Sequence, residues 1–314
     1  MEPDEQRLAD FTTFARAMIA SGDLDPAYPV LAHIARDADY ESTQWLCYLH
    51  LAFYDLASAV TVWLDHPTPT RELPDLVDEL PTGIERRGLR GGRVRAHLRA
   101  MLDVAERDGG SIDAWLTAGF EGDSLVDWLR LTGRIESIPN NGRWAGYKAG
   151  DLWRYVAGLN IEPLGIGAAD ATGPRDGLTA LYDVDYETVR RSDWVDRCEA
   201  LALDLRSHLH ASGVPASIDQ VETLLCDFHS LAHGRYYVGH DIDQQLDQVI
   251  HHGSIPALNA VLAARLASFP REYLSEHPTI GPAAERVNFS FDDEPAVGRA
   301  RRRVYVETGE VVTR

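Results

Sequence analysis

The spacing of apolar residues constrains the fold of this chain more than any other feature, because it follows the period of an α-helix through most of the sequence. Apolar side chains recur at every third or fourth position across residues 45–63, which predicts one long helix that ends at the turn of residues 66–69. Ser217 and Gln220 have the spacing of a capping box and predict the start of another helix. The same periodicity predicts further helices over residues 4–20, 94–107, 124–131, 194–209, 242–250 and 255–267. The predicted fold class is therefore mostly α, with several helices in a compact arrangement.

Strand signals are confined to the end of the chain. Residues 303–306 and 311–312 are rich in strand-forming side chains and flank the turn-like segment 307–310, which predicts a small β-hairpin. We expect residues 1–277 to form a helical domain that carries the functional site, as one unit or as two packed lobes that divide near residues 110–135. The remaining residues, 278–314, then form a linker and a tail that holds the hairpin.

The charge of the chain is strongly negative but unevenly distributed. The 314 residues carry 49 acidic and 30 basic side chains, a formal net charge of −19, which opposes loose binding to a polyanion. The basic residues nevertheless gather in three islands, at residues 86–99, 134–154 and 299–303. Glycines interrupt the first island, which contains Arg90 and Arg93, and aromatic side chains interleave with the second. Such islands suit a local polyanion-binding groove, and solvated arginine-rich helix faces are the alternative interpretation.

Only one of the 30 basic residues is a lysine, Lys148. A lysine that loses its proton when it is desolvated can act as a nucleophile or as a base, whereas an arginine keeps its proton. Lys148 is therefore a candidate catalytic residue, and the alternative is a surface lysine without a special role.

The cysteine content and the N-terminal segment indicate the cellular compartment. Cys47, Cys198 and Cys226 are far apart in the sequence and cannot form a disulfide framework, which is typical of a reducing cytoplasm. The first residues are acidic and lack the apolar stretch of a signal peptide, and the most apolar segment, residues 51–64, is too short to span a bilayer. We therefore expect a cytoplasmic protein that does not interact with membranes.

The first segment that carries chemical information covers residues 138–155. A predicted helix ends near Gly133, a turn rich in proline, asparagine and glycine follows, and a second predicted helix begins near Trp144. Free backbone amides at such a turn and at the following helix start favour a phosphate. This order resembles the helix-hairpin-helix element of DNA glycosylases, which holds the strand while a base is flipped out. The resemblance implies a catalytic Lys148 with Asp170 as its partner, in a DNA-glycosylase-like helical fold.

The second informative segment follows the capping box. A helical wheel places the apolar residues of the predicted helix on one side and the side chains of Cys226, His229 and His233 on the other. Three interpretations of these side chains remain open. They can form a polar helix face in solvent, line a substrate cleft, or bind zinc. The zinc site would be completed by Asp241 or Asp243.

The run from Cys226 to Asp243 contains the sequence Gly-Arg-Tyr-Tyr-Val-Gly-His-Asp-Ile-Asp, and residues 149–153 in the middle of the chain read Ala-Gly-Asp-Leu-Trp. Both motifs resemble signatures of the phage amino acid:DNA transferases, also called α-glutamyl/putrescinyl-thymine pyrophosphorylases. The resemblance extends over residues 10–260, and it implies an enzyme that modifies DNA in the cytoplasm of a phage-infected cell. The strongly acidic composition departs from what is expected of an enzyme that acts on DNA.

The resemblance implies a reaction at 5-pyrophosphoryloxymethyl-uracil in DNA. The amine of an amino acid or a polyamine displaces pyrophosphate from the exocyclic methylene, so DNA and the amine donor are the expected partners. No resident cofactor is implied with certainty, and Mg²⁺ is compatible with pyrophosphate release. The candidates for stabilising charge on the leaving pyrophosphate are Lys148, Arg143 and Arg235.

Further roles follow from the same resemblance. A flipped base is held by aromatic side chains, for which the candidates are Trp144, Tyr147, Tyr236 and Tyr237. The incoming amine must lose a proton to a base, for which the candidates are Asp170, His229, His240 and Asp241. Cys226 is a candidate for addition to C6 of the pyrimidine, and a donor carboxylate calls for an arginine that the sequence does not identify. The remaining candidate contacts to substrate or DNA are Trp153, Asp243, Arg90 and Arg93.

Three other functions remain open, and one of them is an enzyme that acts on a small molecule, for which the acidic composition is no obstacle. A helix-hairpin-helix glycosylase or lyase would use the same Lys148 and Asp170, but it would remove the base through a Schiff base that borohydride traps. A non-catalytic helical interaction protein would have no enzymatic activity. Its binding to a partner would be unaffected by Lys148→Ala or Asp241→Asn.

Overall fold

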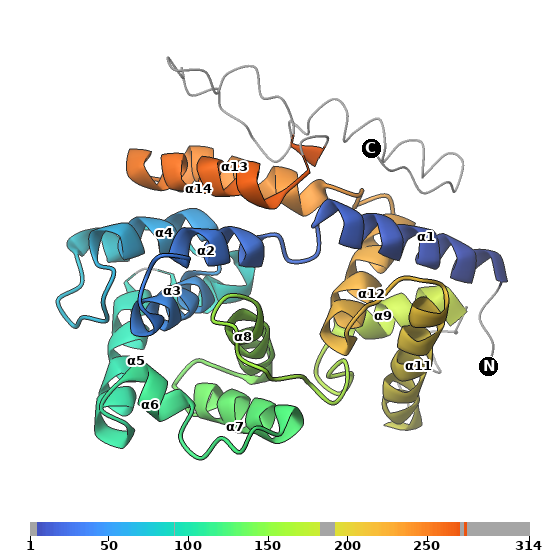
Figure 1. Ribbon diagram of the computed structural model, residues 1–314, viewed down its shortest axis with the longest axis horizontal. Helices are drawn as coiled ribbons and strands as arrows, with labels where there is room; N and C mark the ends of the chain where they lie inside the picture. Colours follow the sequence, from blue (N-terminus) through green and yellow to red (C-terminus); the bar gives the residue numbers. More distant parts are fainter. Residues whose placement is uncertain (1–4, 91, 183–191, 271–272, 275–314) are drawn as a thin grey trace.

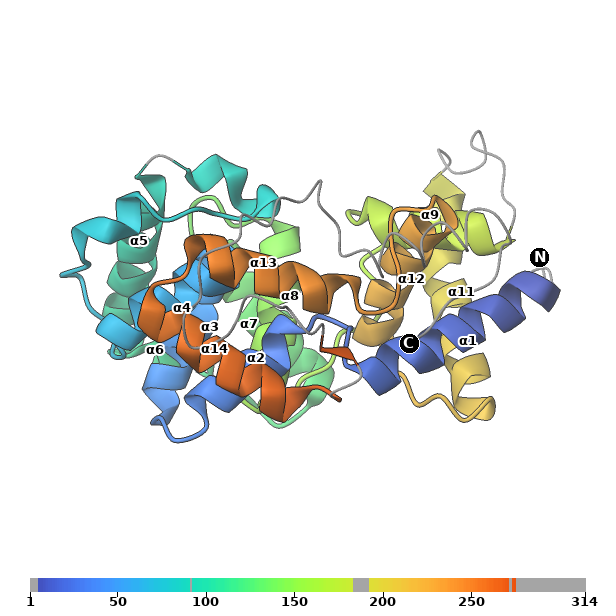
Figure 2. The same cartoon turned by 90° about the horizontal axis from the view of Figure 1, so that it is seen from above.

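The computed structural model describes residues 5–90, 92–182, 192–270 and 273–274. In these residues the chain is helical and contains no strand, which confirms the predicted fold class (Figures 1 and 2). The α-helices are α1 (Glu5–Ser21), α2 (Ala27–Ala35), α3 (Tyr40–Phe53), α4 (Leu56–Asp65), α5 (Arg93–Asp108), α6 (Ile112–Leu116), α7 (Ser124–Glu136), α8 (Arg143–Tyr155), α9 (Thr172–Tyr182), α11 (Ser192–Ala211), α12 (Ile218–Ala232), α13 (His240–His252) and α14 (Ile255–Ser268). Two 3₁₀ helices, η1 (Asp75–Asp78) and η2 (Ile84–Leu89), connect α4 to α5. The hairpin predicted at residues 303–312, the third basic island and the predicted linker lie outside the described residues.

The helices form two groups (Figures 1 and 2). One group contains α9, α11 and α12, with α1 packed against α9 and α12. The other contains α3 to α8, with α2, α13 and α14 along one side. Within the second group α8 packs on α3 and α7, and it lies on the side that faces the first group. No helix in the described part of the chain is long and apolar enough to cross a membrane.

The single helix predicted over residues 45–63 is wrong, because the structure breaks it into α3 and α4. Tyr54 adopts a left-handed backbone conformation with a φ of 47°, which ends α3. The Asp55 side chain then accepts a hydrogen bond from the Ser58 amide at 2.9 Å and caps the start of α4. The apolar pattern continues across the break, and only the capping geometry separates the two helices.

Most other helices lie where the apolar periodicity predicts them. The bounds of α1, α5, α11, α13 and α14 agree with the predicted ranges to within two residues. The capping box of Ser217 and Gln220 is formed at the start of α12. The helix predicted over residues 124–131 is too short, because the apolar face of α7 continues to Ile135, which is fully buried, and the helix ends only at Glu136.

The core behind α8 fixes the position of this helix. Trp153 is fully buried, and its indole nitrogen lies 3.4 Å from Oε1 of Gln44 on α3. The Cys47 thiol, also on α3, donates a 3.9 Å hydrogen bond to the Leu152 carbonyl oxygen. Trp153, a candidate contact to DNA in the sequence, is therefore a core residue in the structure, and it holds α8 against α3.

A buried polar network anchors the turn between α7 and α8. Arg86 of η2 donates hydrogen bonds to the Asn140 carbonyl oxygen at 3.3 Å and to Asn141 Oδ1 at 2.8 Å. Burial and the neighbouring Arg86 lower the pKa of His97 on α5 to about 4, so its ring is neutral. The neutral ring can donate from Nδ1 to the Pro139 carbonyl oxygen at 3.0 Å while Nε2 accepts from Arg86 at 3.0 Å. Arg86, from the first basic island, therefore has a structural role in setting where α8 begins.

Candidate active site

Lys148 of α8 lies among three carboxylates, and we call these four residues the lysine cluster. The ammonium nitrogen is 3.3 Å from Asp151 Oδ2, 3.5 Å from Glu222 Oε2 and 3.6 Å from Asp25 Oδ2. Asp151 lies one turn further along α8, Glu222 comes from α12, and Asp25 comes from the loop between α1 and α2. The cluster therefore lies where the two groups of helices meet.

The charges in the lysine cluster do not balance, because one ammonium faces three carboxylates. The cluster is largely buried, so water screens these charges only weakly. Burial lowers the pKa of Lys148, but Asp25, Glu222 and the other anionic neighbours outweigh burial, and the pKa of Lys148 rises well above its ordinary value. Burial raises the pKa of Asp151 and of Glu222, against the opposing effect of Lys148. Lys148 is thus a stable cation, and the carboxyls of Asp151 and Glu222 hold protons more readily than they would in water.

Asp25 keeps its carboxylate in the cluster by means of an unusual backbone conformation. Its φ of 44° is in the left-handed region, which costs a residue other than glycine about 1–3 kcal/mol. The Thr223 hydroxyl donates a 2.9 Å hydrogen bond to Asp25 Oδ2 and fixes the side chain. Backbone strain of this kind concentrates at functional sites, and here it places a carboxylate beside a buried lysine.

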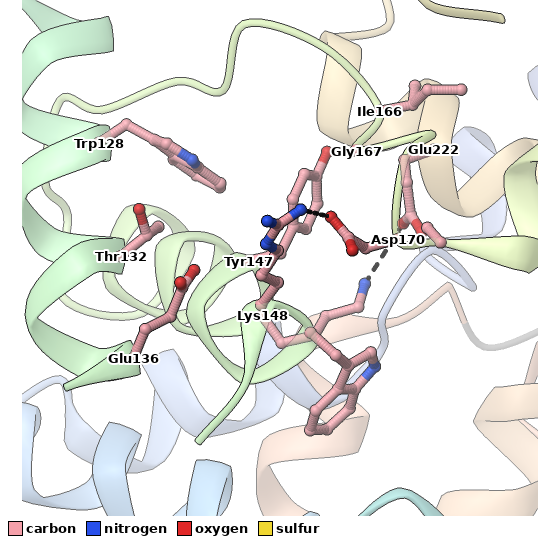
Figure 3. A pocket seen from close by; sticks show the side chains of 12 residues that line it. Trp128, Thr132, Glu136, Tyr147, Lys148, Ile166, Gly167, Asp170 and Glu222 are labelled. Atoms are coloured by element: carbon pink, nitrogen blue, oxygen red, sulfur yellow. Dashed lines mark hydrogen bonds and ion pairs between the residues drawn. The ribbon is translucent and has the colours of Figure 1, made fainter. Parts of the chain in front are cut away.

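Lys148 and Glu222 line a cavity of about 210 Å³, which we call the aromatic cavity (Figure 3). Its lining consists of Trp128, Thr132, Glu136, Arg143, Trp144, Tyr147, Lys148, Ile166, Gly167, Asp170, Ala171 and Glu222. Figure 3 shows the α7 side chains on one side of this cavity and those of Lys148, Asp170 and Glu222 on the other. Aromatic rings beside two cations can hold a flat ring that carries an anionic group.

Two glycines of α8 allow α7 to approach closely enough to form the wall of the aromatic cavity. A Cβ atom at Gly150 would lie 2.3 Å from the Trp128 ring, and one at Gly146 would lie 2.5 Å from Glu136 Oε1. The Trp128 ring meets Tyr147 edge-on, with the ring centroids 5.4 Å apart. Gly146 and Gly150, which are four residues apart, therefore determine the position of the Trp128 ring.

The segment between α8 and α9 closes another side of the aromatic cavity. The Glu199 carboxylate of α11 accepts hydrogen bonds from the amides of Ile166 and Ala168, at 2.9 and 2.7 Å. At the end of this segment Asp170 forms an ion pair with Arg143, the first residue of α8. The sequence predicts Asp170 as the partner of Lys148, whereas in the structure its ion-pair partner is Arg143. Because both side chains are substantially exposed, a phosphate can compete with Asp170 for Arg143.

A second cavity, of about 150 Å³, adjoins the Asp25 and Asp151 side of the lysine cluster, and we call it the acidic cavity. Its lining consists of Leu24, Asp25, Tyr28, Pro29, Asp151, Tyr155, Asp219, Gln220 and Thr223. Tyr155 donates a 2.5 Å hydrogen bond to Asp219 Oδ2, and Arg154 forms an ion pair with Asp219 Oδ1 at 3.4 Å. The lysine cluster is therefore shared between two cavities.

The second sequence motif supports the site from outside the two cavities. Tyr236 donates a 2.9 Å hydrogen bond to Asp23 Oδ2, and Asp23 also accepts hydrogen bonds from the amides of Gly239 and Ile242. Burial raises the pKa of Asp23 to about 8. Because Asp23 and Asp25 belong to the same loop, these bonds fix the loop that supplies Asp25 to the lysine cluster.

Four other candidates from that motif also lie away from the lining of the two cavities. Tyr237 donates a 2.9 Å hydrogen bond to Asp243 Oδ2, and both residues are buried. His240 Nδ1 lies 2.7 Å from Asp241 Oδ1 at the start of α13. These contacts join the α12–α13 turn to the first turn of α13.

The polar face of α12 reaches the lining of the aromatic cavity through Glu222. Cys226 lies one turn further along, where burial and the carboxylate of Glu222 raise the pKa of the thiol well above its ordinary value and keep it protonated. Burial and the nearby His233, whose ring centroid is 4.3 Å away, lower the pKa of His229. Among the described residues, no group of three or more His, Cys, Asp or Glu side chains is arranged to hold a metal, so the zinc alternative finds no assembled site there.

The remaining candidates lie at the surface. Arg90, Arg93 and Arg235 are exposed and do not line either cavity. Arg90 donates hydrogen bonds to Thr82, and Arg93 donates one to a backbone carbonyl oxygen of η2. Trp144, at the rim of the aromatic cavity, is 37% exposed. These side chains stay candidates for contacts with a DNA backbone.

Residues 83–237 match the family described as amino acid:DNA transferase. These residues belong to the amino acid:DNA transferase family. The matched range contains the aromatic cavity and three members of the lysine cluster, and Asp25 precedes it. The protein is therefore a transferase that acts on DNA, in agreement with the resemblance found in the sequence.

Sequence reasoning missed three members of the lysine cluster, although two of them carried a signal. Asp151 stands three residues after the single lysine on the same helix, a spacing that brings two side chains together. Glu222 stands four residues before Cys226 and shares its helix face. Asp25 lies in a short loop far away in the sequence, and no local pattern marked it.

Proposed function

We propose that this transferase attaches the amine of an amino acid or a polyamine to the 5-methylene of a pyrophosphorylated 5-hydroxymethyluracil in DNA and releases pyrophosphate. The nitrogen of the neutral amine would form a bond to the methylene carbon, and the electron pair of the carbon–oxygen bond would leave with pyrophosphate. The observation that carries the proposal is the lysine cluster, which holds a stable cation between an aromatic and an acidic cavity.

The aromatic cavity is the proposed site of the flipped base. Trp128, Trp144 and Tyr147 offer ring surfaces to a pyrimidine that has left the base stack. The cavity includes the first residues of α8, where Gly142 supplies no side chain to cap the helix. The amides of this first turn are suited to a phosphate of the DNA strand.

Lys148 and Arg143 are the proposed partners of the leaving pyrophosphate. Both line the aromatic cavity, and the carboxylates keep Lys148 protonated, so it can offset negative charge that develops on the departing oxygen. Arg143 would exchange its exposed ion pair with Asp170 for the pyrophosphate.

Glu222 is the proposed acceptor of the proton that the amine must lose. It contacts Lys148 and lines the cavity that would hold the methylene carbon. Burial raises its pKa, which brings the carboxyl closer to the neutral range where a general base is effective. In this proposal Glu222 replaces the four bases suggested by the sequence, which are Asp170, His229, His240 and Asp241.

A glycosylase or lyase is less compatible with this site. A Schiff base requires an unprotonated lysine, whereas the carboxylates around Lys148 raise its pKa. We therefore expect no borohydride-trapped crosslink between the protein and DNA that contains the modified base, and a crosslink lost in Lys148→Arg would overturn the assignment.

The decisive test uses DNA that contains 5-pyrophosphoryloxymethyl-uracil. The purified full chain is incubated with this DNA and a mixture of amino acids and polyamines, and the nucleosides are then analysed by mass spectrometry. We expect an aminated nucleoside and one equivalent of pyrophosphate. A nucleoside that keeps its pyrophosphate with every donor would refute the proposal.

A further inference from the structure

The acidic cavity is lined by residues with unpaired buried polar atoms. Within the described part of the chain, neither Asp151 Oδ1 nor the Tyr28 hydroxyl has a hydrogen-bond partner, and Asp219 Oδ1 has only its ion pair with Arg154. Asp151 and Asp219 are 2% and 3% exposed. Buried oxygens that lack hydrogen bonds are rare in native proteins, and two carboxylates of this kind around one cavity indicate a ligand that donates hydrogen bonds.

The charge of the lining selects the sign of that ligand. Asp25, Asp151 and Asp219 contribute three carboxylates, and no lysine or arginine is among the described residues that line the cavity. Lys148 and Arg154 offset part of this charge, but Lys148 contacts Asp25 and Asp151 from the side of the aromatic cavity, and neither cation is among the residues that line the acidic cavity. A cation is therefore attracted to the acidic cavity, and a carboxylate finds no cationic partner among the described residues of the lining.

The aromatic part of the lining also suits a cation. The rings of Tyr28 and Tyr155 are stacked with an interplanar angle of 10° and centroids 6.0 Å apart. Their faces attract an ammonium group, and their hydroxyls can accept its hydrogen bonds. The volume of about 150 Å³ has room for a short aliphatic chain.

We propose that the acidic cavity binds the amine donor of the transferase and that the preferred donor is a short aliphatic diamine. This inference rests on the proposed function, since it identifies the donor of the same reaction. One ammonium group of the diamine contacts Asp219, and the other lies beside Asp151 and gives a proton to a carboxylate of the lysine cluster. The resulting neutral nitrogen bonds to the methylene carbon in the aromatic cavity, and the carbon–oxygen electron pair leaves with pyrophosphate.

A competition experiment tests the preference. The full chain is incubated with DNA that contains 5-pyrophosphoryloxymethyl-uracil and equal concentrations of 1,4-diaminobutane and glutamate, and mass spectrometry gives the ratio of the two products. We expect the diamine product to exceed the glutamate product by at least tenfold, because glutamate brings two carboxylates to an anionic cavity. An equal or larger yield of the glutamate product would overturn the inference.

A substitution connects the preference to the cavity. Asp219→Asn should lower the ratio of diamine to glutamate product by about tenfold, since it removes one charge-assisted contact. The ratio is independent of the fraction of folded enzyme, so partial unfolding of the variant does not obscure the result. The matched control is Asp103→Asn, an exposed carboxylate that lines neither cavity, and it should leave the ratio unchanged. A ratio that Asp219→Asn does not alter would refute the assignment.

Direct binding separates this inference from the proposed function. Titration calorimetry with 1,4-diaminobutane in the absence of DNA should show binding that Asp219→Asn weakens and Asp103→Asn does not. Such binding without any transfer to DNA would uphold the cavity assignment and refute the proposed reaction. Transfer from glutamate without diamine binding would uphold the reaction and refute the cavity assignment.

Discussion

Replacing Lys148 with methionine tests the charge balance at the centre of the site. At distances of 3.3–3.6 Å, each carboxylate attracts the ammonium by about 5 kcal/mol for an effective dielectric constant of about 20. Much of this attraction offsets the cost of burying the charges, and removal of one partner from a buried ion pair usually costs about 3–5 kcal/mol. We expect Lys148→Met to reduce the free energy of unfolding by about this amount at pH 8.

The loss should depend on pH, and the structure gives its sign. Without the lysine, the carboxyls of Asp151 and Glu222, whose pKa values burial already raises, keep their protons to a higher pH in the folded state. A carboxyl that holds its proton in the folded state and loses it on unfolding makes the free energy of unfolding fall by about 1.4 kcal/mol per pH unit. The destabilisation by Lys148→Met should therefore be largest near pH 8 and shrink towards pH 5.

Urea unfolding, followed by circular dichroism at pH 5, 6.5 and 8, measures this effect. The control is Arg143→Met, which removes an exposed ion pair and should cost less than about 1 kcal/mol at every pH. The double variant Lys148→Met/Glu222→Gln should be more stable at pH 8 than Lys148→Met alone, since it carries one fewer unpaired carboxylate. A destabilisation that is the same at all three pH values, or a double variant that is no more stable, would refute the reasoning.

Three other perturbations address the cavity wall, the general base and the loop. Gly150→Ala forces the Trp128 ring to move and should reduce transfer in steady-state kinetics at unchanged helix content, whereas Gly133→Ala, whose Cβ meets no atom within 4 Å, should not. Glu222→Gln should lower kcat by about 10²–10⁴-fold and abolish the acidic limb of the pH–rate profile, and an unaltered profile would contradict its role as the base. Asp23→Asn should flatten the fall in stability with rising pH, because the folded chain holds this proton up to about pH 8 while an unfolded one releases it near 3.8; thermal unfolding from pH 4 to pH 8 measures the slope.

The periodicity of apolar residues was sufficient to predict most of the fold, because each helix buries one face. It failed where a change of backbone direction leaves the apolar pattern intact, as at Tyr54, where a left-handed residue and the cap on Asp55 divide one predicted helix into two. The predicted end of α7 was wrong for a related reason, since its buried face continues beyond the predicted range of residues 124–131.

The candidate site was predictable in part. Lys148, Arg143, Trp144 and Tyr147 were found because they stand close together on one helix, and the structure brings them to one cavity. The carboxylates of Asp25, Asp151 and Glu222 were not found. Asp151 and Glu222 carried a signal in their helical spacing, whereas the contact of Asp25 with Lys148 depends on how the helix groups meet and leaves no local spacing. The candidate bases in the sequence were two histidines and two aspartates, whereas we propose Glu222, which lines the aromatic cavity and whose pKa burial raises.

The loop between α1 and α2 makes the N-terminal segment a part of the candidate site. Two aspartates separated by one residue face different helices from this loop, since Asp23 holds the start of α13 and Asp25 contacts α8 and α12 through Lys148 and Thr223. A fragment cut to residues 83–237 would keep the lysine and lose a wall of the acidic cavity. Deletion of Leu24, the single residue between the two aspartates, should therefore prevent Asp23 and Asp25 from making these contacts at the same time.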